Sequence, residues 1–337
     1  MGDAYTSIAD DEYTLFYNPA ILARHKGFTF WPLNPTITVT DIVNQENSFD
    51  NAGNSSSEFI DNLFDTPIHI GINASPGFKM GRFGFSAIAS NQTSINVLNR
   101  QTPVLDIDQH NDQGFIAGYG FPINGDNAIG ISAKYIKRSG VFGSFNILSP
   151  RVIDFIEDLG NESDPLKFSG LVSDAFGGAS GDGWGFDFGW DYVKRQGDNL
   201  FTAGFSVIDI FTNLKTNPNN NGSEVQSQPL KANLGASYLI KKNGFGIQLS
   251  GDVRNLEDKD LELRKRLRFG AELHLSPALS ALAGYNSGQY SYGMKLNIGF
   301  LKTYVGLYGL DVGESLDQQV SRRALIYISL FDFNFDV

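Results

Sequence analysis

Apolar and polar residues alternate along most of the chain. Between Gly183 and Tyr192 every second residue is aromatic, and glycine or aspartate fills the positions between. Successive side chains of a β-strand point to opposite faces, so this segment predicts a strand with one aromatic and one polar face. The same alternation recurs in about fourteen segments: 27–40, 67–75, 82–98, 113–121, 127–139, 183–194, 199–211, 229–240, 244–254, 264–275, 278–286, 289–300, 302–310 and 322–336.

The connections between these segments alternate in length. The long ones are 41–66, 99–112, 140–182, 212–228, 255–263 and 311–321. The short ones are 75–81, 122–126, 195–198, 241–243, 276–277 and the step at 301. Only 287–288 is short where a long connection is due. Short turns at one end and long loops at the other predict an all-β fold, a transmembrane antiparallel up-and-down β-barrel of about 14 strands.

The two faces of the expected strands favour a membrane over water. A soluble sandwich or propeller also alternates, but its exposed face usually carries many Lys, Glu and Thr residues. Here the second face is rich in Gly, Ser and Asn, which suits a lumen, while the aromatic face suits contact with membrane lipid. The segments are also close to the length that a tilted strand needs to cross a bilayer.

Composition narrows the class further. Charged residues make up 19% of the chain, and there is no cysteine for a disulfide, a zinc site or a thiol nucleophile. The net charge of -11 argues against a nucleic-acid partner. No apolar run is long enough for a membrane helix. No signal peptide is visible after Met1, and we expect a protein of the cell outer membrane whose signal peptide is removed or not included.

The segment 1–26 precedes the first expected strand and does not read as one. Asn18 followed by Pro19 is a helix-start signal, because Asn caps and Pro suits the first turn. The apolar content of this segment favours an N-terminal plug inside the lumen, containing Tyr17, Asn18, Pro19 and Ala20, over a disordered tail. The barrel itself is expected at 27–337.

The longest connection, 140–182, contains two amphipathic helical patterns, each of which starts with a capping residue followed by Pro. Helices with apolar faces on a water-facing loop must pack against something, whether each other, the barrel, a ligand or a partner. We therefore predict a helical third outer loop that captures ligand or contacts a partner. Its apolar residues are Val152, Phe155, Ile156, Leu159, Leu166, Phe168, Leu171, Val172 and Phe176.

The first 22 residues, MGDAYTSIADDEYTLFYNPAIL, resemble the N-terminal signature of the FadL-like outer-membrane proteins. That group includes fatty acid and aromatic hydrocarbon transporters and the related PorV-type barrels. The matching features are Gly2–Tyr5, Ala9–Asp11 and Tyr17–Ala20. The resemblance implies fourteen strands, an internal plug and a helical third outer loop, in agreement with the pattern.

No constellation for catalysis or for metal binding stands out. Four histidines are scattered, none with metal-ligand spacing, and no nucleophile motif such as GxSxG is present. The charged loop at 256–260 suits a solvated turn of mixed charge better than a calcium site. We therefore expect no enzyme and no cofactor.

Two functions stay open. In the first, the barrel is a channel for uptake of small hydrophobic molecules of fatty acid or hydrocarbon type. The plug gates it, and a lateral exit lies in the third strand, where alternation fails at Ser90, Asn91, Gln92 and Thr93. In the second, a non-conducting PorV-type barrel is the docking partner or scaffold of a secretion, motility or surface-protein complex. It would bind its protein partner through outer loops or the periplasmic face.

Overall fold

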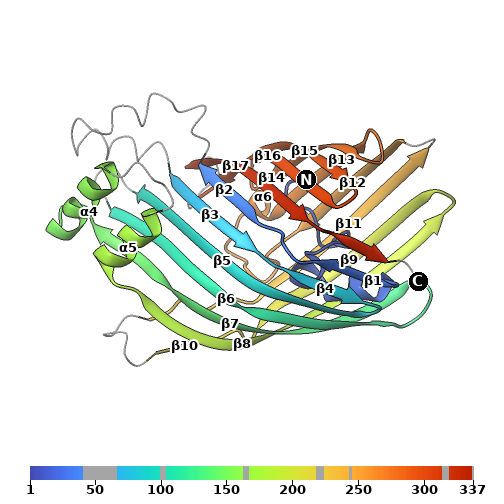
Figure 1. The fold of residues 1–337 in the computed structure, drawn as a ribbon, viewed down its shortest axis with the longest axis horizontal. Helices are drawn as coiled ribbons and strands as arrows, with labels where there is room; N and C mark the ends of the chain where they lie inside the picture. Colours follow the sequence, from blue (N-terminus) through green and yellow to red (C-terminus); the bar gives the residue numbers. More distant parts are fainter. Residues whose placement is uncertain are drawn as a thin grey trace.

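The computed structural model describes residues 1–40, 67–98, 104–161, 167–217, 224–242, 245–312 and 319–335. Its main element is a single antiparallel sheet that closes on itself as an elongated barrel (Figure 1). The helices in these ranges are α1 (Thr14–Tyr17), the 3₁₀ helix η1 (Pro19–Arg24), α4 (Pro150–Asn161), α5 (Phe168–Phe176) and α6 (Leu263–Arg266). Among the described helices, none has the length and apolar character needed to cross a membrane.

The strands follow the chain around the ring, each hydrogen-bonded to its neighbours. They are β1 (Phe28–Trp31), β2 (Thr36–Thr40), β3 (Ile68–Ala74), β4 (Gly77–Met80), β5 (Phe83–Leu98), β6 (Val104–Pro122), β7 (Asn127–Asn146), β8 (Ala179–Gln196), β9 (Asn199–Ile210), β10 (Lys215–Thr216), β11 (Lys231–Lys242), β12 (Phe245–Val253), β13 (Leu267–His274), β14 (Leu279–Asn286), β15 (Gln289–Ile298), β16 (Leu301–Asp311), β17 (Val320–Leu330) and β18 (Phe333–Phe335).

These elements make a wall of fourteen strands. The pairs β1 with β2, β3 with β4, and β17 with β18 are each one interrupted strand, and the short β10 only extends the pairing of β8. Closure joins the first strand to the last, with Phe28 opposite Phe335 and Thr40 opposite Arg323. Every pairing is antiparallel. The predicted fold class, a closed antiparallel barrel of about fourteen strands, is confirmed.

Strand β8 shows how the alternation places side chains. Trp184 faces outward with 53% of its surface exposed, whereas Asp187, three residues on, is 3% exposed. The inward Asp187 accepts hydrogen bonds from Ser132 (2.7 Å) and from the Lys134 ammonium (2.8 Å). The aromatic residues of this strand therefore cover the outside of the wall, and its carboxylates meet polar partners inside it.

Strands β5 to β8 are longer than their sequence pattern suggested. They have 16, 19, 20 and 18 residues, well beyond the roughly 9–11 that a tilted strand needs to span a bilayer. The predicted loop 99–112 is therefore wrong from Val104 onward, because β6 begins there, and the predicted loop 140–182 shortens to residues 147–178. The extended end carries α4 and α5 (left end of Figure 1).

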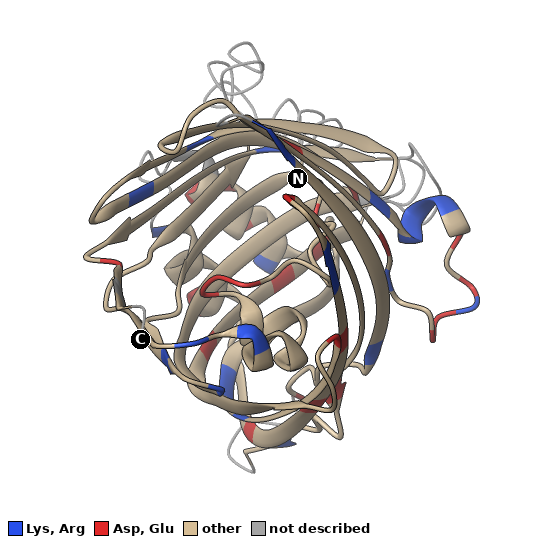
Figure 2. Cartoon of the chain, turned by 90° about the vertical axis from the view of Figure 1, so that its right-hand side faces the viewer, with Lys and Arg blue, Asp and Glu red and all other residues tan. Residues whose placement is uncertain are grey.

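The first 24 residues run through the lumen (Figure 2), and we call this segment the plug. Glycines on the inner face of the wall make room for its backbone. A Cβ at Gly130 would lie 2.3 Å from the Ala20 nitrogen, and one at Gly189 would lie 2.0 Å from the Asn18 side-chain oxygen. Further glycines of this kind, each with plug atoms against it, are Gly84, Gly118, Gly120, Gly204, Gly270 and Gly284.

Polar contacts fix the plug to the wall at β8 and at β12. Asn18 is fully buried and donates to the backbone oxygens of Thr6 (3.1 Å) and of Trp190 on β8 (3.0 Å). Asp252 on β12 accepts from the backbone nitrogens of Tyr5 (2.9 Å) and Thr6 (2.8 Å). Ion pairs add to these contacts; they join Arg24 to Asp191 and Asp3 to Arg254.

We expect Gly130→Ala to unseat the plug, because the added methyl group would overlap the backbone of Ala20. Amide hydrogen exchange of residues 1–24 should then be much faster than in the parent protein. Gly251→Ala is the matched control, since a Cβ there faces outward and its nearest neighbours, the Phe269 ring at 3.4 Å and the Arg268 backbone oxygen at 3.8 Å, lie at ordinary contact distances. Unchanged protection of the plug in Gly130→Ala would contradict this packing.

Candidate functional site

A cavity of about 690 Å³ lies in the lumen between the plug and the wall strands β13 to β17. This is a usual size for a small-molecule site. Tyrosines dominate its lining: Tyr5, Tyr13 and Tyr17 come from the plug, and Tyr304, Tyr308 and Tyr327 come from the wall. We call it the tyrosine cavity. The rings of Tyr304 and Tyr327 stack with centroids 4.8 Å apart.

Strand register orders the wall of this cavity into three rows. In the middle row, Leu282, Gly293, Gly306 and Leu325 are cross-strand neighbours, which leaves two positions without side chains between two leucines. The row toward the long-loop end includes Ser291 opposite Tyr308. The row toward the short-turn end includes Lys295 opposite Tyr304. The wall therefore offers a flat apolar surface between two polar rows.

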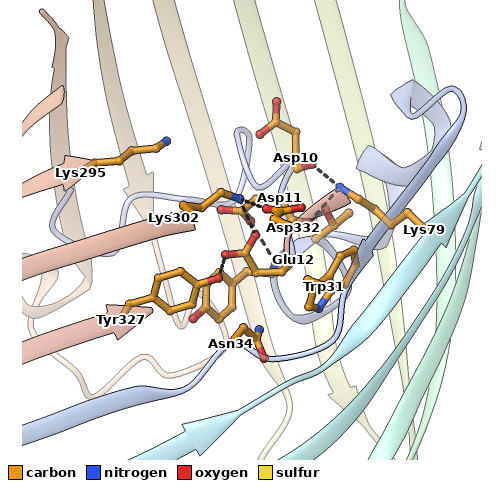
Figure 3. A network of polar contacts seen from close by, with 12 residues as sticks. Asp10, Asp11, Glu12, Trp31, Asn34, Lys79, Lys295, Lys302, Tyr327 and Asp332 are labelled. Carbon is orange, nitrogen blue, oxygen red and sulfur yellow. Dashed lines mark hydrogen bonds and ion pairs between the residues drawn. The ribbon is translucent and has the colours of Figure 1, made fainter. Parts of the chain in front are cut away.

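A cluster of acidic plug residues, Asp10, Asp11 and Glu12, lies beside the cavity, and we call it the acidic loop (Figure 3). The Glu12 carboxylate accepts from the Tyr327 hydroxyl and lies 3.2 Å from the Lys302 ammonium. Lys79 on β4 donates to the backbone oxygens of Asp10 and Asp11. Lys302 also reaches Asp332 at 2.8 Å.

The two carboxyl groups of this loop differ in their protonation. Burial, together with the negative charge of Glu12, raises the pKa of Asp11 from 3.8 to about 7. Burial also acts on Glu12, but the charge of Lys302 and the hydrogen bond from Tyr327 outweigh it and lower the pKa of Glu12. The protonation state of Asp11 therefore changes near neutral pH while Glu12 stays charged.

The acidic loop faces an interruption of the wall. Three adjacent strands lose their regular pairing at the same level, at Pro32–Pro35 between β1 and β2, at Ser75–Pro76 between β3 and β4, and at 331–332 between β17 and β18. Four residues separate Trp31 from Thr36, whereas three separate their partners Gly77 and Asn73. The prolines lack a backbone N–H, which disfavours a regular ladder here.

Side chains replace the missing backbone ladder at this wall interruption. Ser75 donates its backbone N–H to the Asn34 side-chain oxygen (2.8 Å), and Asn34 donates to the Ser75 hydroxyl (3.0 Å). The buried Trp31 ring donates to the Ser75 backbone oxygen (2.7 Å). Side-chain contacts thus join Asn34 and Trp31 to Ser75 at this point of the wall, which we call the seam.

The interruption lies between two internal spaces. Thr36, at one side of it, lines the tyrosine cavity, whereas Trp31, at the other side, lines a second cavity of about 980 Å³. The second cavity includes the short-turn residues Asn124 and Asp126, so it lies at the short-turn mouth of the barrel. Asp11 lines both spaces, which places the acidic loop between them.

The sequence pattern places a lateral exit at Ser90, Asn91, Gln92 and Thr93, where the alternation of apolar and polar residues fails. Strand β5 is continuous there, and all four residues are paired with β3 on one side and β6 on the other. Alternation fails because the outward positions do not meet lipid. Asn91 instead donates to Ser169 of α5 (3.3 Å). The nearby wall interruption lies one strand away, in β3 and β4.

The residues predicted for ligand capture form a closed apolar core. Val152, Phe155, Ile156, Leu159, Val172 and Phe176 are each at most 8% exposed and pack with residues of β3, β5, β6 and β7. Phe168 and Leu171 pack at its edge. Leu166 lies outside the described residues.

This core lies on the outside of the wall. Leu105 and Ile107 lie on the same outward face of β6 as Phe115. They are nevertheless fully buried, because α4 and α5 cover them. The two helices therefore protect the apolar outer face of β5 to β7 where these strands extend beyond the span that a bilayer would cover. Truncating Phe155 would remove a buried ring from this core, so its loss would report on folding rather than on ligand capture.

Several residues of the site can be recognised from the sequence by asking which face of its strand each residue occupies. Tyr304, Tyr308 and Tyr327 occupy the lumen-facing parity of their strands, where small polar residues are the rule in this chain. Pro32, Pro35 and Pro76 interrupt neighbouring strands. The pairing of Lys79 and Lys302 with the acidic loop has no local signal, because it depends on how the plug folds back into the barrel.

Two of the solved structures with a similar architecture are named as monoaromatic hydrocarbon channels. CymD is 13% identical, with 98% of this chain and 95% of that chain covered and a TM-score of 0.51. A TodX deletion mutant is 12% identical, with coverage of 99% and 97% and a TM-score of 0.51. The chain has the fold of these channels.

The predicted resemblance to FadL-like barrels is thus confirmed at the level of the fold. The toluene transporter TbuX of Ralstonia pickettii also aligns, at 13% identity over 96% of this chain and 94% of its own, with a TM-score of 0.48. No family model and no curated protein sequence matches this chain. A closed barrel with short turns at one end and an apolar exterior is the architecture of the bacterial outer membrane, where the sequence analysis places the chain.

Docking of the plug should weaken as the pH rises through about 7. The docked plug holds the Asp11 proton more strongly than a solvated aspartate does, so this stabilisation is present at low pH and is lost as pH rises through the raised pKa. Hydrogen exchange of residues 1–24, corrected for its intrinsic pH dependence, should show greater protection at about pH 5 than at about pH 8.

The variant Asp11→Asn should remove this pH dependence, because the amide does not titrate. Asp10→Asn is the control, since the Asp10 side chain is exposed and should leave the pH dependence in place. Equal protection of the plug at both pH values in the parent protein would contradict the assignment.

Proposed function

We propose that this barrel takes up small hydrophobic molecules across the outer membrane. The observation that carries the proposal is the tyrosine cavity, a lumen space between a fixed plug and an interrupted wall. The solved structures with this fold, CymD and TodX, are monoaromatic hydrocarbon channels, which supports the same class of cargo here.

In this proposal the molecule leaves through the wall rather than through the plug. The plug is fixed to the wall on several sides by buried hydrogen bonds and ion pairs, so displacing it would break many of them at once. At the wall interruption, by contrast, the Asn34, Ser75 and Trp31 contacts replace a ladder. Lateral release also lets an apolar molecule enter the bilayer without crossing the polar short-turn mouth.

The acidic loop is the gate of this exit. Its lysine partner Lys79 lies on β4, next to the interruption, and its partner Tyr327 lies on β17, on the other side. A small shift of the loop therefore acts on both edges of the seam while the rest of the plug stays docked. Protonation of Asp11 near neutral pH changes the charge at this point.

The alternative, a docking barrel without transport, has less support from the described residues. Its expected contact surface was the apolar face of the loop helices, and the barrel itself covers that face. A protein partner would have to bind elsewhere, such as the polar face of α4 with the exposed Asp154 and Glu157.

A crosslinking experiment tests both the transport and the exit. The chain contains no cysteine, so a pair introduced as Asn34→Cys and Ser75→Cys is unique and can be closed by a short thiol-reactive crosslinker. Uptake of labelled naphthalene should need the gene, and closing this pair should abolish it, because the seam can no longer part.

The matched control is Asn73→Cys with Ser90→Cys, which replaces the same residue types where the wall is continuous and the side chains are 2.5 Å apart. Closing the control pair should leave uptake unchanged. Uptake that persists with Asn34 and Ser75 crosslinked would refute the exit. Equal uptake with and without the gene would refute transport and favour the docking alternative.

A further inference from the structure

The tyrosine cavity contains buried polar atoms that lack hydrogen-bond partners. Among the described residues, these include the Asn286 side-chain oxygen, the Ser291 hydroxyl and one carboxylate oxygen of Glu272. All three residues line the cavity, and each is at most 8% exposed. They come from three consecutive strands, β14, β15 and β13, so they gather on one side of the space.

Acceptors dominate this side of the cavity. The unpartnered oxygen of Glu272 lies 3.5 Å from the Lys295 ammonium and 3.3 Å from the His274 ring, and neither contact is a hydrogen bond. The Asn286 oxygen can only accept, whereas the Ser291 hydroxyl can accept or donate. Buried acceptors without a donor are costly, so a ligand with hydroxyl hydrogens is stabilised here.

The neighbouring apolar row suits a flat ring. Leu282 and Leu325 stand on either side of Gly293 and Gly306, and Ser291 lies one row away, next to Tyr308. A ring lying on the two glycines would have its edge directed toward the acceptors. Charged residues of both signs line the same cavity, with carboxylates at Asp3 and Glu272 and an ammonium at Lys295.

We propose that the tyrosine cavity selects aromatic molecules that carry hydroxyl groups over bare aromatic hydrocarbons. This inference rests on the proposed function for its transport role and narrows the class of cargo. A hydrocarbon of the same shape fills the apolar surface over Gly293 and Gly306 but donates no hydrogen bond to Asn286, Ser291 or Glu272. Sites built to hydrogen-bond a hydroxyl discriminate strongly against the analogue without one.

Naphthol and naphthalene test this selection, because they share a ring system and differ by one hydroxyl. Binding of each to the purified protein gives a ratio of dissociation constants, and comparing this ratio between variants cancels partition into detergent. Relative to the parent protein, Ser291→Ala and Asn286→Leu should each reduce the preference for naphthol by about tenfold, the effect of one lost buried hydrogen bond. Affinity for naphthalene should stay within about twofold.

Ser206→Ala is the matched control, since the Ser206 hydroxyl is also buried and unpartnered but does not line the cavity. A second pair of variants tests whether the ligand binds in the cavity. Leu282→Trp should weaken the binding of both naphthol and naphthalene, because the larger ring fills part of the cavity. Leu273→Trp, on the membrane side of the adjacent strand, should leave the binding of both unchanged.

The inference is overturned if Ser291→Ala and Asn286→Leu leave the naphthol preference at the parent value, or if Leu282→Trp binds both probes normally. Failure of the proposed function gives a different result. Cells with and without the gene would then take up both probes equally, while the purified protein would still prefer naphthol in a manner that depends on Ser291.

Discussion

The pairing of backbone groups in a lipid-embedded wall constrains the whole molecule. An N–H or C=O exposed to acyl chains costs several kcal/mol, so a sheet that spans a membrane must close. Here Phe28 to Thr40 pair with Arg323 to Phe335 and complete the ring. In the described part of the wall, three adjacent strands break this pattern together near Ser75, where Asn34, Trp31 and Ser86 side chains pair with Ser75 and a few backbone hydrogen bonds remain, such as that from Leu330 to Leu33. The location of the seam therefore follows from the same constraint that builds the barrel.

The inner face obeys a second constraint, which is space. A fourteen-stranded barrel encloses more volume than its own inward side chains fill, and the plug occupies part of it. Glycines such as Gly130 and Gly189 let the plug backbone lie against the wall. Where the plug is absent, between Tyr17 and Tyr308, the tyrosine cavity is left. Cavity, plug and seam meet at the acidic loop, so a change there acts on all three.

Much of the fold could be predicted from local sequence, because alternation has a short period. The outward Trp184 and the inward Asp187 follow directly from it. The extension of β6 to Val104 could not be predicted in this way, because its outward residues are covered by α4 and α5 rather than by lipid. For the same reason the alternation fails at Asn91, whose side chain contacts Ser169 of α5 instead of lipid.

The site was less predictable than the fold. The loop helices have a strong apolar pattern, but periodicity does not say what covers Phe155, and the answer is the barrel itself. The contact of Glu12 with Tyr327 joins residues 315 positions apart in the sequence, and the register of the whole ring brings them together. Tyr304 and Tyr308 are aromatic residues at strand positions where the alternation predicts a polar, lumen-facing side chain. Aromatic residues at such positions are the signal to use in related barrels.

The most direct measurement is the crystal structure of the protein soaked with a brominated naphthol, with the bromine located by its anomalous scattering. The account predicts a peak in the lumen over Gly293 and Gly306, between the plug and strands β13 to β17, with the plug still docked. A bromine found only on the lipid-facing surface, or in the space vacated by a displaced plug, would contradict it.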